Sequence, residues 1–199
     1  MRLRPRPHSM NRAIPFGLRA LQFVAALAVL ILAAILVKRQ VMGSPPATTR
    51  FATFTGVVGM LASVIGVWSL VSLYLSPPTP AVFDVLAGLL FLAGGIASAL
   101  GLYGVDNCNL YDIMLHSPLL NQGSTGSGAG RRYGVVSPND DESAVFRKLH
   151  GNCWRAQLWM ILQFVSFGIA VGLVTIGYLQ IKRAKLRGAG AGVSRYPAD

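Results

Sequence analysis

Two ionisable side chains lie within long apolar stretches, and they are the first candidates for chemistry. Arg19 lies near the start of the apolar run 14–37, and Asp84 lies near the start of the run 80–103. An ionisable group inside a membrane must face protein, water or the headgroup layer. If both runs begin at the same membrane face, Arg19 and Asp84 share a depth, and we expect an ion pair that fixes the helix register. The alternative is a proton or ion pathway, although a relay needs further acids, histidines or hydroxyls at successive depths.

The two cysteines, Cys108 and Cys153, flank the long polar segment of the chain. With the topology given below, both lie at the non-cytoplasmic face, where oxidising conditions let a disulfide persist. In the chain-entropy model, closing a loop of roughly 45 residues is worth about 4 kcal/mol. We predict this disulfide; two unpaired thiols, or palmitoylation of Cys153, are the alternatives.

Other residues with chemical capacity lack the partners that a site needs. His150 and Cys153 could form half of a metal site, but no second pair at zinc spacing accompanies them. The glycine-rich stretch 123–130 lacks the Gly-Lys-Ser/Thr of a phosphate loop, and the acids 140–142 lack the spaced ligands of a calcium loop. We interpret the first as a linker and the second as a solvated helix start. No catalytic set, metal or cofactor is predicted, so we expect no enzyme.

The composition sets the class of protein that must position these residues. The 199 residues are 53% hydrophobic with a mean hydropathy of +0.52, above the roughly 45–50% apolar content of soluble domains. The net charge is +11, and the basic residues stand beside apolar runs. This placement indicates anionic lipid headgroups as the partner, and not nucleic acid.

Four apolar runs are long enough to cross a bilayer as helices, which takes about 20 residues each. They cover residues 14–37, 54–75, 80–103 and 154–181. These runs predict an all-α fold, a four-helix transmembrane bundle within a membrane domain over 14–181. The linker after the second span is short and rich in proline, so spans two and three must be antiparallel neighbours.

The segments around the spans set the topology. We expect residues 1–13 to be a disordered basic tail and 104–153 to be a long second outer loop after a short first one. We expect 182–199 to be a basic C-terminal tail, loose from residue 188 on. Within the long loop, 139–148 predicts a short helix with an acidic first turn. Four spans place both termini on one side, and the Lys and Arg residues near span ends place that side in the cytoplasm.

Small residues predict where helices pack against each other. Gly94, Gly95 and Ala97 lie in the third span, and Gly168 and Gly172 form a small-xxx-small motif in the fourth. Small residues at such spacing let helix backbones approach closely in lipid. These positions are therefore the predicted helix-packing sites.

The span ends carry the predicted lipid contacts. A basic cluster directly after the fourth span predicts binding to anionic headgroups; it consists of Lys182, Arg183, Lys185 and Arg187. Trp159, early in the fourth span, is interpreted as an interface anchor. Trp68 lies deeper, and we expect it to pack between helices.

The amino-acid sequence of the spans resembles a known family. Leu18-Arg-Ala-Leu-Gln-Phe23, Gly66-Val-Trp-Ser-Leu70, the run from Asp84 to Ala97, and the paired cysteines are similar to the fungal branch of the MARVEL domain family. The resemblance covers residues 14–181. Claudins and tetraspanins fit less well, because the first loop lacks the claudin Trp and cysteine pattern and the long loop lacks Cys-Cys-Gly.

The resemblance implies a non-enzymatic role in organising membranes. That role is vesicle trafficking, membrane apposition or the scaffolding of sterol-rich microdomains, in the plasma membrane or in secretory-pathway vesicles. The implied partners are membrane lipids, including anionic headgroups and sterol, together with further copies of the chain or other membrane proteins. A small transporter or channel subunit organised on Asp84 is the alternative function.

Overall fold

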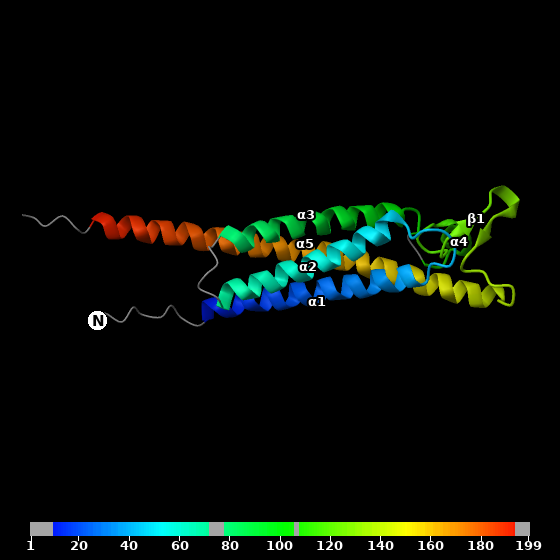
Figure 1. The fold of residues 1–199 in the computed structure, drawn as a ribbon, viewed down its shortest axis with the longest axis horizontal. Helices are drawn as coiled ribbons and strands as arrows, with labels where there is room; N and C mark the ends of the chain where they lie inside the picture. The colour runs from blue at the N-terminus through cyan, green and yellow to red at the C-terminus, as the bar shows by residue number, and fades with distance from the viewer. Residues whose placement is uncertain (1–9, 72–77, 106–107, 194–199) are drawn as a thin grey trace, which may run out of the picture.

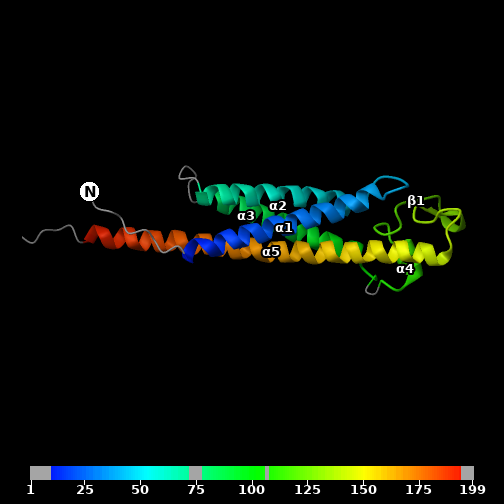
Figure 2. The ribbon, with the colours of Figure 1, turned by 90° about the horizontal axis from the view of Figure 1, so that it is seen from below.

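Four long helices lie side by side and form an elongated bundle in the computed structural model (Figures 1 and 2). The structure describes residues 10–71, 78–105 and 108–193. The long helices are α1 (Met10–Lys38), α2 (Ala47–Val71), α3 (Pro78–Gly101) and α5 (Glu142–Val193). All four contain a segment long and apolar enough to cross a membrane, namely Ala13–Lys38, Ala47–Val71, Pro80–Gly101 and Glu142–Leu179. The predicted all-α, four-helix membrane fold is confirmed.

Glycines set the packing of α1 against α2. A Cβ at Gly56 would come within 2.9 Å of the Leu30 side chain, and one at Gly59 would lie 3.0 Å from Ala26 and overlap the ring of Phe91 on α3. Along this interface a higher residue number on α2 meets a lower one on α1, so the two helices are antiparallel. Close backbone approach through glycine supplies van der Waals contact, the main packing term between helices in lipid.

The pairing of α3 with α5 follows the same pattern. Gly88 lies against Ala170, and Gly95 lies against the ring of Phe164. The added Cβ would be 3.2 Å from Ala170 and 3.0 Å from Phe164. The antiparallel register of α3 and α5 is therefore fixed at several successive turns.

The helix α5 is longer than expected at both ends. Residues 139–148 were expected to form a separate short helix, and the segment from Gly188 on was expected to be loose, but α5 is continuous from Glu142 to Val193. Gly151 does not interrupt it, because one glycine costs only about 1 kcal/mol in a helix and the neighbouring Asn152 donates a hydrogen bond to the carbonyl of Leu120 at 3.0 Å.

The helix α1 also begins earlier than expected, at Met10, so the expected disorder of 1–13 is wrong for residues 10–13. Residues 1–9 and 194–199 lie outside the described part.

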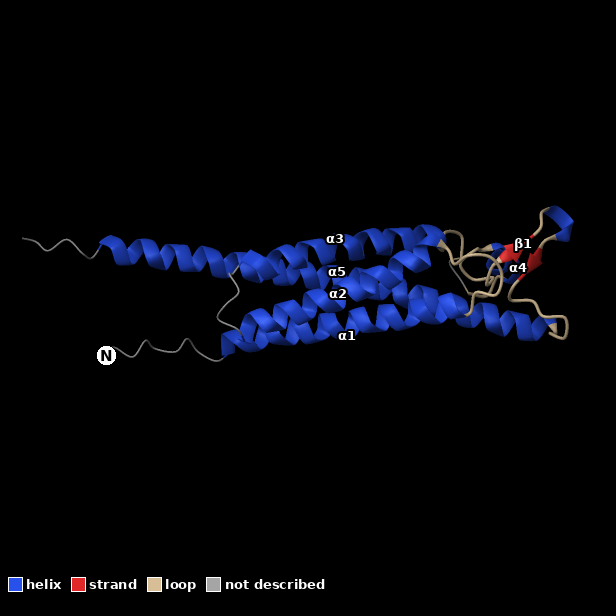
Figure 3. Cartoon of the chain, in the orientation of Figure 1, coloured by secondary structure: helices blue, strands red, loops and turns tan. Residues whose placement is uncertain are grey.

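A small folded unit covers one end of the bundle, and we call it the cap: the described residues of 104–153. It contains α4 (Tyr111–His116), a 3-10 turn (Gly128–Gly130) and the antiparallel pair β1 (Ser124–Thr125) and β2 (Arg132–Tyr133), which appear in Figure 3. Its core is continuous with that of the bundle and includes Met114, Leu120, Val135, Leu149 and Trp159.

The first loop is tied to the cap. The amides of Val41 and Met42 both donate to the carbonyl of Gln122, at 3.0 and 3.1 Å. Gly123 has φ +93°, and a Cβ there would run into the Met42 carbonyl. A residue without a side chain is therefore required where these two loops meet. The start of α1 and the end of α5 lie at the opposite end of the molecule from the cap (Figure 1).

Candidate functional site

Arg19 on α1 and Asp84 on α3 form a buried ion pair inside the bundle. The guanidinium Nη1 donates to Asp84 Oδ1, and Nη2 donates to Oδ2 at 2.5 Å. The exposed fractions of the two side chains are 7% and 2%. Two parallel charge-assisted hydrogen bonds give this pair directional specificity as well as strength.

Two neighbours shape the space around the guanidinium. Gln22, one turn further along α1, accepts a hydrogen bond from Arg19 Nη1 at 3.4 Å. Gly66 on α2 lies directly against the guanidinium, so that any Cβ there would overlap it. Arg19 therefore reaches Asp84 along the backbone of α2, and three helices meet at one point.

The geometry of the pair favours positioning over transport. Each charge is compensated by its partner, and both are held in a fixed fork. The buried hydroxyls of Ser63 and Ser98 donate to carbonyls of their own helices, at 2.8 Å each. These hydroxyls are thus engaged with backbone and do not extend a chain of groups from Asp84.

A second polar contact joins α3 to α5. Trp159 Nε1 donates to Ser98 Oγ at 2.8 Å, and the Trp159 side chain is fully buried. Trp159 therefore packs between helices, and its interpretation as an interface anchor is wrong. Trp68 was expected to pack between helices, and this expectation is also wrong, because the side chain is 65% exposed on the outward face of α2.

Gln163 lies against Gly94 in the same interface. A Cβ at Gly94 would overlap the amide oxygen of Gln163, and both polar atoms of that amide are buried with no hydrogen-bond partner in the described chain. The close fit of the amide oxygen on the glycine backbone suits a Cα–H···O contact. The buried residues of this face lie at helical intervals on α5, at positions 156, 159, 163, 166, 170 and 173, but a mixture of Ala, Trp, Gln, Ser and Leu carries no sequence pattern that would have revealed it.

The predicted packing residues fall into two groups. Gly94 and Gly95 are buried against α5, and Ala97 is half-buried. Gly168 and Gly172 face away from the other helices, because a Cβ at either position would meet nothing within 4 Å. Packing at Gly168 and Gly172 stays a prediction, and it would involve another molecule.

The predicted disulfide between Cys108 and Cys153 is confirmed. Their Cα atoms lie 5.8 Å apart, and the bond joins the chain after α3 to α5. Cys153 is fully buried in the common core of cap and bundle. The disulfide therefore closes the cap at its base.

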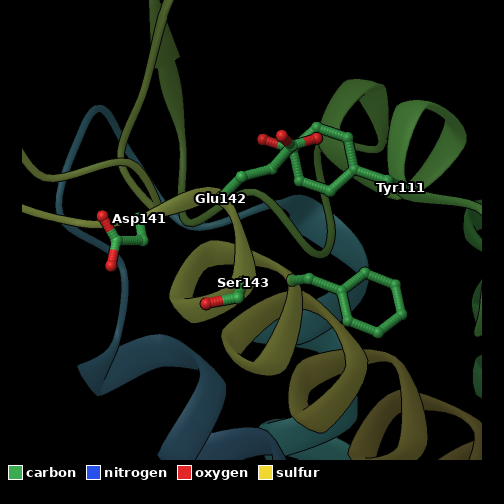
Figure 4. A pocket seen from close by; sticks show the side chains of 5 residues that line it. Tyr111, Asp141, Glu142 and Ser143 are labelled. Atoms are coloured by element: carbon green, nitrogen blue, oxygen red, sulfur yellow. The ribbon is translucent and has the colours of Figure 1, made fainter.

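The acidic stretch at the start of α5 is divided between two roles. Asp140 Oδ2 accepts hydrogen bonds from Lys148 Nζ and from the amide of Ser137. The hydrogen bond from Lys148 is the main cause that lowers the pKa of Asp140 below its usual value. Asp141 and Glu142 instead line a shallow pocket of about 540 Å³ with Tyr111, Ser143 and Phe146 (Figure 4). Among the described residues, no cluster of three potential metal ligands occurs.

The basic cluster lies at the other end of α5. Lys182, Arg183, Lys185 and Arg187 follow the membrane-spanning segment, which ends at Leu179, and they continue the same helix. Lys182 is exposed. One helix thus connects the cap to a basic extension.

The comparison with known protein families agrees with this architecture. A family model described as MARVEL, membrane-associating domain, matches residues 12–176. Comparison with curated proteins and with solved structures gave no match. Proteins of the matched family are generally non-enzymatic and are linked to membrane apposition and trafficking. With the match covering four spans and the cap, the chain belongs to the MARVEL family of membrane-associating domains.

Proposed function

We propose that this protein is a non-enzymatic membrane organiser, in the plasma membrane or in secretory-pathway vesicles. Its bundle couples a disulfide-closed cap on the non-cytoplasmic face to a basic helix on the cytoplasmic face. The observation that carries the proposal is the continuity of α5, which runs from the cap through the bundle to Lys182 and beyond. A continuous helix transmits position between its ends without a flexible joint.

The proposed orientation has two supports. The disulfide between Cys108 and Cys153 belongs in an oxidising compartment. The basic cluster at the opposite end agrees with the enrichment of Lys and Arg on cytoplasmic faces. Both observations support a topology with the cap outside and the ends of α1 and α5 inside.

The basic extension would gather anionic lipid around the bundle. Each Lys or Arg near an anionic surface contributes about 1 kcal/mol, so four contribute about 4 kcal/mol. For each anionic lipid held beside one basic residue, about 1 kcal/mol corresponds to a roughly fivefold local enrichment. Screening reduces it as the ionic strength rises.

Lipid sorting by the full chain tests this proposal. The labelled protein is reconstituted in phosphatidylcholine vesicles with a small fraction of labelled phosphatidylserine, and energy transfer reports enrichment of the anionic lipid. Substituting glutamine at Lys182, Arg183, Lys185 and Arg187 should abolish the enrichment. Substituting glutamine at Arg147, an exposed basic residue of the cap, should retain it. Equal enrichment with and without the basic cluster contradicts the proposal.

A further inference from the structure

The pocket at the start of α5 combines two aromatic rings with two carboxylates. Tyr111 comes from α4, and Phe146 comes from the second turn of α5; both are half-buried. Asp141 and Glu142 are exposed at its rim, and in Figure 4 the Glu142 side chain extends toward Tyr111. The pocket is thus an open, partly apolar hollow with negative charge at its edge.

This chemistry suits a planar cation. A guanidinium stacks on aromatic faces and forms forked hydrogen bonds with a carboxylate, whereas an ammonium does so less well. The helix start alone accounts for Glu142, since acids are favourable in a first turn, but it does not account for the two rings. Asp140 is engaged by Lys148, while the described chain shows no side-chain hydrogen bond or ion pair for Asp141 or Glu142.

The same cap exposes a matching pair of cations. Arg131 and Arg132 are exposed beside the tip of the β1–β2 hairpin, and no ion pair involves either of them in the described chain. The tip turns through Gly126 and Gly128, with φ +86° and +60°. The hairpin packs against α4, where the rings of Tyr133 and His116 meet edge-on with their centroids 5.6 Å apart. Even so, neither Arg131 nor Arg132 pairs with Asp141 or Glu142 of its own cap in the described chain.

We propose that the occupant of this pocket is the hairpin of a second copy of the chain. Arg131 or Arg132 of each copy enters the pocket formed by Tyr111, Glu142 and Phe146 of the other. Because basic tip and acidic pocket lie on one cap, two copies related by a two-fold axis make this contact twice. The proposal deepens the proposed function, on which it rests, because it specifies a cap-to-cap contact through which a membrane organiser can assemble.

Charge reversal and mixing test the contact. Self-association of the full-length, disulfide-intact protein is measured in neutral detergent by analytical ultracentrifugation. One variant carries Arg131→Glu and Arg132→Glu, and the other carries Asp141→Lys and Glu142→Lys. Each alone should associate at least about tenfold more weakly, because like charges then face each other. An equimolar mixture should recover association, since every basic group again faces an acidic one.

A matched control separates this contact from a general charge effect. Asp112→Lys changes an exposed acid of the same cap that does not line the pocket, and it should leave association unchanged. Association should also weaken at 1 M salt, where the Debye length falls to about 3 Å. Thiol titration and thermal unfolding establish that each variant keeps its fold.

Three results would overturn the proposal. In the first, the folded variants do not recover association when they are mixed. In the second, Asp112→Lys weakens association as much as the pocket variant does. In the third, the wild-type protein stays monomeric while its pocket binds arginine methyl ester. The last result would assign the pocket to a small cation instead of a second copy. The measurement contains no lipid bilayer, so its outcome is distinguishable from a failure of anionic-lipid sorting.

Discussion

Removing one partner of the Arg19–Asp84 pair should destabilise the bundle far more than removing both. In Asp84→Asn the shape of the side chain is kept, but Arg19, with 7% of its side chain exposed, retains a buried charge without a counter-ion. Breaking a buried pair in this way costs about 3–5 kcal/mol. Arg19→Met leaves the Asp84 carboxylate in the same position and should cost a similar amount.

The double variant Arg19→Met, Asp84→Asn contains no buried charge. Its expected cost is at most about 2 kcal/mol, because the desolvation penalty of both charged groups disappears with them. The coupling free energy of the double-mutant cycle is then several kcal/mol. Reversible unfolding in mixed micelles with increasing denaturing detergent measures all four proteins with the disulfide intact.

Additive effects in this cycle would refute the reasoning. If the two single variants each cost less than about 1 kcal/mol and their effects add, the pair does not hold α1 against α3. A flux measurement on the same reconstituted variants addresses the transport alternative. Loss of ion or proton flux in folded Asp84→Asn protein, with flux present in the wild type, would favour a pathway over a positioning role.

Three further predictions concern the cap and the α3–α5 interface. Replacing Cys108 by serine should lower the free energy of unfolding by about 4 kcal/mol, measured by the same unfolding assay, and an unchanged midpoint would contradict a structural role for the disulfide. Gly94→Ala should cost about 1–3 kcal/mol through overpacking, whereas Gly172→Ala, with nothing within 4 Å of the new Cβ, should change stability by less than about 0.5 kcal/mol. Lys148→Gln should raise the pKa of Asp140 toward its usual value, as followed by carboxyl NMR. Because the pKa of Asp140 is lowered in the folded state, the Lys148–Asp140 contact stabilises the wild-type fold above the unfolded-state pKa. This stabilisation is lost as the pH falls through the folded-state pKa.

The four spans could be predicted from sequence because each depends on a local property, the length of an apolar run. The Arg19–Asp84 contact could be anticipated as well. Consecutive spans alternate in direction, so the first and third are parallel, and both charges lie a few residues after the start of their spans at the same depth. The disulfide followed from topology, because Cys108 and Cys153 flank the same loop. In each case one strong constraint decides the outcome.

Other features depend on tertiary contacts that a single sequence does not encode locally. Trp159 and Trp68 both lie in apolar spans, and only the helix neighbour decides that the first is buried against Ser98 and the second faces outward. The continuity of α5 through Gly151 depends on the packing of the cap around it. The pocket between Tyr111 and Phe146 joins residues from two separate helices, so no motif in the sequence marks it.

Cysteine accessibility on intact cells is the most direct test of the central claim, that α5 couples an outer disulfide-closed cap to a cytoplasmic basic helix. With this orientation, the half-buried Cys108 reacts with a membrane-impermeant maleimide added from outside, and only after reduction, whereas the fully buried Cys153 stays unlabelled in the folded protein. Labelling of either cysteine from the cytosolic side, or labelling from outside without reductant, would contradict it.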